Sequence, residues 1–385
     1  MAKERIALMR CPSYADQDVE AALEQAMNAL GGMPSFVRAG QRVLIKVNLL
    51  TRRPPEAAVT THPALVRAVI REVQKAGGHP VIYDSPGGPF TTKSLEAVYE
   101  ATGMATVAAE TGAELNWDVS SVEVPNPSGM LFQGLTLSRA VVEADVVINL
   151  PKLKTHGLTR YTGAVKNLFG CIPGLTKAEY HLRLPELPLF SRFLVELAQF
   201  VRPALTIMDA VVGMEGEGPS AGRPRKLGLV LAGSSPFALD RVALALIGLK
   251  ADEVETAKIA AELGLAPPME DIAILGEDIS SLAVRDFAVP PPGGTSFRLL
   301  GRRLSPDTLK IFARWLKPRP LFAAAKCRRC GICLRDCPAK ALTMGEHRPE
   351  VDLARCIRCF CCQELCPEQA VSIYRPALTR WIFRH

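Results

Sequence analysis

Nine of the eleven cysteines lie between Cys327 and Cys366, in two runs with one shared spacing. Both runs, CRRCGICLRDCP (327–338) and CIRCFCCQELCP (356–367), fit the pattern C-x2-C-x2-C-x3-C-P. Thiolates at every third residue of a short loop can hold three corners of an iron–sulfur cubane, while the fourth ligand comes from the other run. The spacing therefore predicts two [4Fe–4S] clusters.

The crossover of the fourth ligand divides the cysteines into two sets. We expect the first cluster to be held by Cys327, Cys330, Cys333 and Cys366, and the second by Cys337, Cys356, Cys359 and Cys362. Cys361 does not fit the spacing. We interpret it as a non-ligand thiol beside the second cluster, and a register in which it replaces Cys362 is the alternative. Paired zinc sites also use C-x2-C pairs, but four cysteines and a closing proline in each run favour the clusters.

Residues 323–376 resemble the two-cluster bacterial-type ferredoxin module. The segments KCRRCGICLRDCPAKALTM and RCIRCFCCQELCPEQAVSI are near-copies of each other, and each ends in a strand-like tail. The resemblance implies a small α+β domain that transfers electrons.

Positive charge is concentrated in this end of the chain. Residues 301–385 carry 17 Lys+Arg against 7 Asp+Glu, although the resemblance to ferredoxins implies an acidic surface. A basic redox surface attracts acidic proteins, so we expect an acidic electron donor such as a ferredoxin or flavodoxin, and no nucleic-acid partner. The alternative is a basic surface that only maintains solubility.

A second segment, NLPKLKTHGLTRYTGAVKNLFGCIPG (149–174), contains several cations and no acid. A solvated basic loop is the usual interpretation of such a segment. The lack of any acid, the position directly after a predicted strand and a lysine on a neighbouring strand favour an anionic small-molecule ligand instead. The predicted ligand-binding residues are Lys46, Asn48, Lys152, Lys154 and Asn167.

Two residues of this segment are candidates for catalysis. His156 is its only histidine and the best candidate proton donor near neutral pH, with a structural histidine as the alternative. Lys166 is the second catalytic candidate. Cys171 has no visible activating group, so we expect it to be buried packing. A further alternative is a divalent metal, although helix capping and turns explain Asp84 and Asp240 at least as well. The acids that could bind such a metal are Asp84, Asp209, Glu215, Glu217 and Asp240.

Short apolar segments alternate with helix-like segments over the first three hundred residues. The predicted strands are 42–48, 80–88, 145–152, 205–213 and 227–235. A helix over 61–78, capped by Thr60 or Thr61, and a short helix over 158–169, ended by Gly170, are also predicted. This alternation indicates an α/β fold with a mostly parallel sheet and helices on both faces, in which ligands bind at the carboxyl ends of the strands.

These segments carry a second resemblance. KVNLL, TTHPALVRAVI, VIYDSPGG, the basic segment, IMDAVVGMEGEGP and GSSPFALDRVA are similar to the uncharacterised-domain family numbered 362, over nearly all of residues 1–287. In that family a C-terminal ferredoxin module is often fused, as here, and the resemblance implies no particular reaction. A looser likeness to the N-terminal domain of lactate racemase fits an anion-binding α/β site.

The predicted domain organisation has four parts. Residues 1–287 form the ligand-binding domain, 288–322 a Pro/Gly linker with an amphipathic helix over 305–320, 323–376 the ferredoxin domain, and 377–385 a basic aromatic tail. We expect the helix to dock the ferredoxin domain, with peripheral membrane contact as the alternative. We expect no signal peptide and no transmembrane segment, and therefore a cytoplasmic protein.

The combined expectation is an iron–sulfur electron-transfer protein. We expect a ferredoxin-fused reductase that delivers low-potential electrons to an anionic ligand in the α/β domain. No G-x-G-x-x-G fingerprint follows a strand, which weakens the enzyme interpretation. The alternative is an electron carrier, or a factor for cofactor or cluster maturation, whose α/β domain docks a partner protein.

Overall fold

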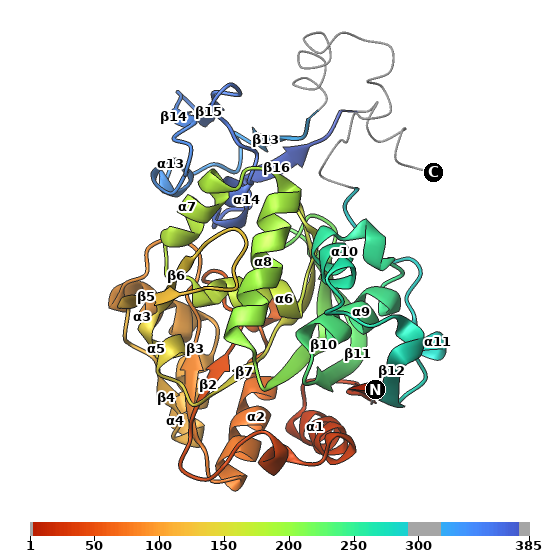
Figure 1. The fold of residues 1–385 in the computed structure, drawn as a ribbon. Helices are drawn as coiled ribbons and strands as arrows, with labels where there is room; N and C mark the ends of the chain where they lie inside the picture. Colours follow the sequence, from red (N-terminus) through yellow and green to blue (C-terminus); the bar gives the residue numbers. More distant parts are fainter. Residues whose placement is uncertain (1–2, 292–316, 377–385) are drawn as a thin grey trace.

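The computed structural model describes residues 3–291 and 317–376 of the 385-residue chain. In Figure 1 the large α/β domain forms the body of the molecule, and the ferredoxin module sits at one end of it, beside helices α7 and α8.

A ten-stranded sheet forms the centre of the α/β domain, in the order β12-β1-β11-β10-β7-β2-β3-β4, with β8 and β9 attached through β10. The run β10-β7-β2-β3-β4 is parallel, and β11 runs antiparallel to both of its neighbours. The strands are β1 (Glu4–Arg10), β2 (Arg42–Lys46), β3 (His79–Tyr83), β4 (Glu114–Leu115), β7 (Val146–Asn149), β8 (Lys152–His156), β9 (Arg160–Thr162), β10 (Leu205–Glu215), β11 (Arg223–Gly233) and β12 (Ile272–Gly276), with β5 (Ser121–Pro125) and β6 (Gly134–Ser138) as a separate hairpin.

Helices cover both faces of this sheet. The helices are α1 (Asp16–Leu30), α2 (Pro63–Lys75), α3 (Thr92–Ala101), α4 (Met104–Thr111), α5 (Arg139–Val142), α6 (Ala164–Asn167), α7 (Thr176–Arg183), α8 (Leu187–Val201), α9 (Pro236–Leu246), α10 (Glu255–Glu262) and α11 (Ile279–Leu282). On β2, Val43 and Ile45 join the core under α1 and α2, whereas Leu44 joins the core under α8. Successive side chains of a strand point to opposite faces, so a strand buried on both faces reads as one apolar run. The predicted fold class is confirmed.

The side chain that caps α2 differs from the prediction. His62, and neither Thr60 nor Thr61, occupies the N-cap, where its imidazole accepts a hydrogen bond from the backbone N–H of Ala64. Pro63 occupies the first helical position, which suits a residue without an N–H group. The Thr61 hydroxyl instead accepts a hydrogen bond from the backbone N–H of Asn48, in the loop after β2.

The predicted helix over 158–169 is wrong in its first half. Residues 152–162 form the hairpin β8–β9, and helix α6 begins only at Ala164. Thr155, Tyr161 and Thr162 favour strand geometry, and Arg160 adopts a left-handed backbone with φ 65° in the turn. The cationic residues before this point therefore lie on a strand, not on a loop.

The ferredoxin module is built from short elements. Strands β13 (Arg319–Phe322) and β16 (Val371–Tyr374) pair with each other, as do β14 (Leu342–Met344) and β15 (Pro349–Val351). The one-turn helices α13 (Ile332–Arg335) and α14 (Cys361–Glu364) each lie within a cysteine run, after its second cysteine. The predicted amphipathic helix over 305–320 lies almost wholly outside the described residues, and the tail 377–385 lies outside them entirely.

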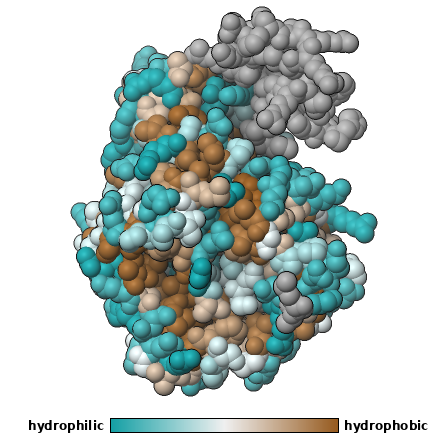
Figure 2. Space-filling model, viewed as in Figure 1, coloured by the Kyte–Doolittle hydropathy of each residue, from teal (hydrophilic) through white to brown (hydrophobic). Residues whose placement is uncertain are grey.

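Figure 2 shows hydrophobic residues on the visible face over α7 and the neighbouring end of α8. Three leucines of these segments are exposed: Leu175, Leu182 and Leu189. Most of the remaining visible face mixes hydrophilic and hydrophobic residues.

Candidate functional site

The cysteines of the ferredoxin module line two separate cavities. The first is lined by Cys327, Cys330, Cys333 and Cys366. The second is lined by Cys337, Cys356, Cys359 and Cys362, and also by Cys361. In each set three thiols come from one run and the fourth comes from the other, which is the grouping that the spacing predicts.

The donor chemistry of both cavities fits a [4Fe–4S] group. Backbone N–H groups donate to the sulfurs of three predicted ligands: Arg329 to Cys327 Sγ (3.4 Å), Ala341 to Cys337 Sγ (3.4 Å) and Ala370 to Cys366 Sγ (3.2 Å). Such bonds to sulfur adjust cluster potentials. Within residues 3–291 and 317–376, no three His, Cys, Asp or Glu side chains converge on a single-ion position.

A third and larger cavity, of about 100 Å³, lies where the α/β domain meets α14. The loops after β2 and β3, strand β8 and the segment from α6 to α7 form its α/β walls. The ferredoxin module closes it with Asp336, Cys361, Glu364 and Leu365. Cys361 lines both this cavity and the second cysteine cavity, so one thiol borders both sites.

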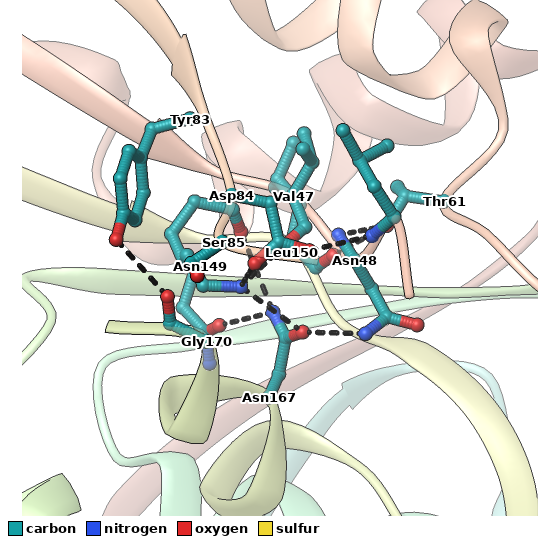
Figure 3. Close-up of polar contacts among 12 residues, drawn as sticks. Val47, Asn48, Thr61, Tyr83, Asp84, Ser85, Asn149, Leu150, Asn167 and Gly170 are labelled. Carbon is teal, nitrogen blue, oxygen red and sulfur yellow. Dashed lines mark hydrogen bonds and ion pairs between the residues drawn. The ribbon is translucent and has the colours of Figure 1, made fainter. Parts of the chain in front are cut away.

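A buried ion pair forms one end of this cavity. Lys46 Nζ lies 2.7 Å from Asp84 Oδ1, and it also donates to the carbonyl of Val47. The loop at Gly170 passes so close that a Cβ there would collide with the Asp84 carboxylate and lie 2.6 Å from Lys46 Nζ. The Tyr83 hydroxyl holds this loop by donating to the carbonyl of Gly170 at 3.0 Å (Figure 3). Any side chain at position 170 would therefore displace this ion pair.

Asn48 and Asn167 are joined in a largely buried amide network (Figure 3). Asn48 Nδ2 donates to Asn167 Oδ1 at 2.9 Å, and Asn167 Nδ2 donates to Asn149 Oδ1 at 2.8 Å. The backbone N–H of Asn48 donates to the Thr61 hydroxyl, which donates to the carbonyl of Leu150. The network fixes the end of β2 against α6, and both asparagines line the cavity.

Lys154 points from β8 into the cavity. Its ammonium donates to Asn48 Oδ1 at 2.6 Å and to the carbonyl of Val59 at 2.7 Å. Burial, and then the nearby Lys166, lower the pKa of Lys154 to about 7. The residue is 1% exposed, and both hydrogen-bond acceptors of its ammonium are neutral oxygens.

Two further lysines line the same cavity. Lys177 donates to the hydroxyl and carbonyl of Ser85, at 2.7 and 2.8 Å, and burial lowers its pKa to about 7. Lys166 Nζ lies 5.7 Å from the centre of the Phe169 ring, and burial lowers its pKa against the opposing effect of Glu364. No carboxylate among the described residues forms an ion pair with Lys154, Lys166 or Lys177.

His156 forms a direct contact between the two domains. Its Nε2 lies 3.0 Å from Glu364 Oε1, while its Nδ1 accepts the backbone N–H groups of Leu158 and Thr159. Burial, and then Lys166, lower the pKa of His156 to about 4. Burial acts to raise the pKa of Glu364, but His156 and Lys166 outweigh it and hold that pKa at about 2. At neutral pH His156 is therefore uncharged, and its ring proton lies on Nε2.

Lys152 is not brought to this cavity. Its ammonium lies 2.9 Å from Asp209 Oδ2 and donates to the Tyr14 hydroxyl at 2.7 Å. Tyr14 donates in turn to Asp209 Oδ1, and it stacks on His62 with ring centres 3.6 Å apart. This closed network differs from the ligand-binding role predicted for Lys152.

The acids considered as metal ligands have other partners. Glu215 pairs with Arg223, Glu217 pairs with Arg375, and Asp240 accepts the backbone N–H groups of Ala164 and Val165 at the start of α6. Asp84 and Asp209 pair with lysines, as described above. Cys171 is fully buried, and burial raises the pKa of its thiol to about 12.

Several cavity residues did not follow from the sequence. Lys177 and His181 lie on α7, for which no motif was recognised, and Glu364 and Leu365 lie inside the second cysteine run. For Glu364 a signal exists, because the two runs are near-copies and it replaces Arg335 of the first run.

The ferredoxin module is fastened to the loop between β10 and β11. Gln363 Nε2 donates to the carbonyl of Glu217 at 2.8 Å, and the Ser220 hydroxyl donates to the carbonyl of Gln363 at 3.2 Å. Arg375 Nη1 lies 2.6 Å from Glu217 Oε1. These contacts place α14 against the cavity.

The helices in the described part of the chain are all too short or too polar to cross a membrane.

Comparison with known proteins identifies both parts of the chain. Residues 43–245 match the family described as Domain of unknown function (DUF362), and residues 319–367 match the 4Fe-4S dicluster domain. The chain is 36% identical over 294 residues to the thylakoid-associated protein sll1697 of Synechocystis sp. (strain ATCC 27184 / PCC 6803 / Kazusa), covering 74% of this chain and 87% of that protein. The name of that relative refers to a thylakoid location.

Two solved structures share a distant likeness. The lactate racemase apoprotein from Thermoanaerobacterium thermosaccharolyticum is 16% identical, with a TM-score of 0.37, over 60% of this chain and 54% of that chain. A Thermotoga maritima protein is 12% identical, with a TM-score of 0.35, over 66% and 60%. This chain thus spans less than two thirds of either protein, and likenesses at these scores support no argument about its activity.

The matched cysteine segment indicates a protein that binds 4Fe–4S groups. The DUF362 match covers more than half of the chain and includes most of the α/β residues that line the third cavity. The chain therefore belongs to the DUF362 family and carries a C-terminal 4Fe–4S dicluster domain.

Proposed function

We propose that this protein is a ferredoxin-fused reductase that binds two [4Fe–4S] clusters and delivers electrons to an anionic ligand in the third cavity. Clusters held by the two cysteine sets would supply electrons one at a time. An acidic donor protein is oxidised, and the ligand is reduced.

The observation that supports this function best is the position of α14. This helix lies within the second cysteine run, and Cys361 and Glu364 at its two ends line the ligand cavity. Electron transfer requires the ligand and the redox centre to lie close together, and this arrangement provides that proximity within one chain.

A comparison of the two cysteine runs supports the same conclusion. In the matching positions Ile332 corresponds to Cys361, and Arg335 corresponds to Glu364. The Arg335 side chain is 56% exposed, whereas the Glu364 side chain is 13% exposed and lies against His156. The second run therefore differs from the first at positions that face the α/β domain.

The α/β domain would bind the ligand with its uncompensated cations. Lys154 and Lys166 supply positive charge, while Lys46, Asn48 and Asn167 form the end of the cavity. His156, uncharged near neutral pH, would position the Glu364 carboxylate at the cavity wall through Nε2 instead of acting as an imidazolium acid. Lys152 supports the neighbouring strands through Asp209 and has no direct contact with the ligand in this proposal.

The partner would be an acidic ferredoxin or flavodoxin in the cytoplasm. Residues 317–376 contain 11 Lys+Arg against 6 Asp+Glu. Three cations of the first cysteine loop are exposed: Lys326, Arg328 and Arg329. Opposite surface charges accelerate association between redox partners.

Native mass spectrometry of protein purified without oxygen tests the proposal. A mass above the polypeptide and two four-iron clusters would reveal a bound ligand, and loss of that mass in Lys154→Gln would place it in the cavity. A mass that fits two clusters alone, with no ligand reduced by the protein, would favour an electron carrier or maturation factor whose α/β domain docks a partner. Fewer than two clusters in intact protein would contradict the proposal.

A further inference from the structure

We propose that Lys166 and His181 are the side chains of the third cavity that contact its ligand, and that they select a small acid with a second, neutral oxygen group. This inference rests on the proposed function in taking the ligand to be anionic. It adds which side chains bind the ligand and which polar group the ligand carries besides its acidic group.

Two of the cavity lysines have no hydrogen-bond donor left for a ligand. A lysine ammonium has three N–H groups. Lys177 has three acceptors in the protein, namely the hydroxyl and carbonyl of Ser85, at 2.7 and 2.8 Å, and the carbonyl of Ile172 at 3.0 Å. Lys46 also has three acceptors: the carboxylate of Asp84, the carbonyl of Val47 and Oδ1 of Asn167. Both lysines therefore maintain the cavity wall.

Lys166 is the cavity lysine whose N–H groups remain free. Within residues 3–291 and 317–376 its Nζ has no hydrogen bond and no ion pair, and it lies over the Phe169 ring, 5.7 Å from the ring centre. Lys154 is intermediate, because its Nζ has two neutral acceptors. A polar group enclosed by protein is costly unless it is hydrogen-bonded. A ligand in the cavity would supply the acceptors that Lys166 lacks.

His181 is a second polar side chain of the cavity without a partner. It is 6% exposed, and neither ring nitrogen forms a hydrogen bond with any group in the described part of the chain. Aromatic contacts hold its ring instead: it stacks on Phe190 with ring centres 4.2 Å apart and meets Phe169 edge-on at 5.6 Å. Buried polar groups are nearly always hydrogen-bonded. An unpartnered imidazole that lines a cavity therefore indicates a ligand group opposite it.

The Phe169 ring brings both side chains to one part of the cavity. Nζ of Lys166 lies 5.7 Å from the centre of this ring, and the His181 ring centre lies 5.6 Å from it. All three residues line the cavity, whose volume of about 100 Å³ limits its occupant to a small molecule. One small ligand can therefore contact both side chains.

The two side chains favour different groups of that ligand. The free N–H groups of Lys166 match an oxyanion, a carboxylate or a phosphoryl group, which only accepts hydrogen bonds. Burial lowers the pKa of His181 to about 3, so its ring is neutral at physiological pH. A neutral imidazole has one donor nitrogen and one acceptor nitrogen, which matches a hydroxyl or a carbonyl oxygen. The ligand class is thus a small acid that carries such an oxygen.

A competing explanation is that neither side chain meets a ligand. Lys166 lies near Cys361, so it could serve only to balance the negative charge of a [4Fe–4S] group and its thiolates. His181 could serve only as a flat ring between Phe169 and Phe190. Ligand binding by designed variants separates these roles from the proposed one.

The experiment is isothermal titration calorimetry on the full chain with its clusters, without oxygen. The probes are pairs that differ by one hydroxyl group: glycolate and acetate, 3-hydroxypropionate and propionate, and 2-hydroxyethyl phosphate and ethyl phosphate. We expect at least one hydroxy acid to bind about fivefold or more tightly than its parent acid, as one additional hydrogen bond in a buried site allows. The pair that shows this preference identifies the oxyanion as carboxylate or phosphoryl.

Three variants assign the contacts. Lys166→Met keeps a long side chain over Phe169 and should weaken both members of the preferred pair about tenfold or more. His181→Phe keeps a ring against Phe190, and it should abolish the preference for the hydroxy acid while the affinity for the parent acid is unchanged. Lys93→Met, the same change as at position 166 but on an exposed residue of α3, should alter neither.

Several results would overturn the inference. A preference that is absent from every pair, or that survives His181→Phe, removes the role of His181. Unchanged affinities in Lys166→Met remove the role of Lys166, and a shifted cluster potential in that variant would assign the lysine to the cluster. Binding of none of the probes overturns both roles. Lys166→Gln and His181→Leu replace any variant that fails to fold.

The inference and the proposed function can fail separately. If a hydroxy acid binds through Lys166 and His181 but no ligand is reduced, the inference stands and the reductase function falls. If a co-purifying ligand is reduced but its binding is unchanged in both Lys166→Met and His181→Phe, the function stands and the inference falls.

Discussion

Glu364 and His156 lie 3.0 Å apart across the boundary between the ferredoxin module and the α/β domain. The histidine belongs to β8 and the glutamate to α14, so the wall of the third cavity is built jointly by two domains that the sequence presents as separate. Because Nδ1 of His156 accepts backbone N–H groups, its proton faces the carboxylate. The position of the redox module and the polarity of the cavity are therefore linked.

Replacing Cys361 and Cys362 separately tests the cluster ligands. We expect Cys361→Ser to retain about eight iron atoms per chain and Cys362→Ser to retain about four, because only the second thiol fits the spacing for a cluster ligand. Iron and acid-labile sulfide analysis, with electron paramagnetic resonance of the reduced protein, measures both. The opposite result would establish the register in which Cys361 is the ligand.

Reversing exposed charge near the first cysteine set tests the donor surface. Lys326 and Arg328 are exposed, and the Arg328 side chain is 78% accessible. We expect the double change Lys326→Glu and Arg328→Glu to slow reduction by an acidic flavodoxin about tenfold at low salt, since electrostatic steering mainly changes association rates. The difference should largely disappear near ~1 M salt, where charges are screened within about 3 Å.

Stopped-flow bleaching of the cluster absorbance measures this rate. Lys93→Glu, a reversal on exposed α3, is the matched control and should have little effect. Equal slowing by both changes would indicate a general charge effect and would rule out a docking surface at the first cysteine set.

Removing the charge of Asp209 tests the network around Lys152. Asp209→Asn leaves the buried ammonium of Lys152 without its carboxylate, which lies 2.9 Å away. We expect the free energy of unfolding to fall by about 3 kcal/mol, as is typical when one partner of a buried ion pair is removed. Glu114→Gln, which breaks the exposed pair with Arg42, should cost less than about 1 kcal/mol. Denaturant titration compares the two, and similar small losses would show that the network contributes little.

His62 should make stability depend on pH. Burial lowers its pKa from 6.5 to about 4, although Asp209 opposes the shift. The unfolded chain therefore binds more protons than the folded chain between these values, so stability is complete above about pH 6.5 and falls as the pH falls towards 4. At pH 6.0 the free energy of unfolding should be about 1 kcal/mol lower than at high pH because of His62.

The matched variants for this prediction are His62→Asn and His79→Asn. Asparagine is a good N-cap residue, so His62→Asn removes the titrating group and keeps the cap of α2. Unfolding free energies at pH 7.5 and 6.0 should differ less in His62→Asn than in the original protein, whereas the exposed His79 should not matter. An unchanged pH dependence in His62→Asn would refute the assignment.

The sequence predicted the central strands β2, β3, β7, β10 and β11, because a strand buried on both faces is one apolar run, as in residues 42–48. It did not predict β1, β4, β8, β9 or β12. It was not sufficient to separate Lys152 from Lys154. Both occupy alternate positions of β8, and period-two alternation places them on one face. The pairing with β10 jumps from Asp209 opposite Lys152 to Met214 opposite Lys154, and this irregularity sends the two side chains to different partners. Such a bend depends on tertiary pairing that no local pattern encodes.

Lys177 shows a second limit. Its role depends on Ser85, which is brought beside it only when the segment before α7 folds over the end of β3. Glu364 was not predicted for another reason. The cysteine spacing accounts for its run, and nothing in that spacing assigns a role to the residues between the cysteines.

Glu364 and Leu365 of the ferredoxin module form part of the wall of the third cavity. This limits how the two domains of such a fusion can be exchanged between relatives. A Cβ on Gly87 would collide with Leu365, and one on Gly157 would collide with Ile373, so the two domains fit each other at atomic contact. Grafting the redox domain of a relative onto this α/β domain would therefore exchange part of the binding pocket along with the electron carrier. In the function proposed above, ligand specificity would be inherited through the pair of domains, and a chimaera would need compensating changes in both.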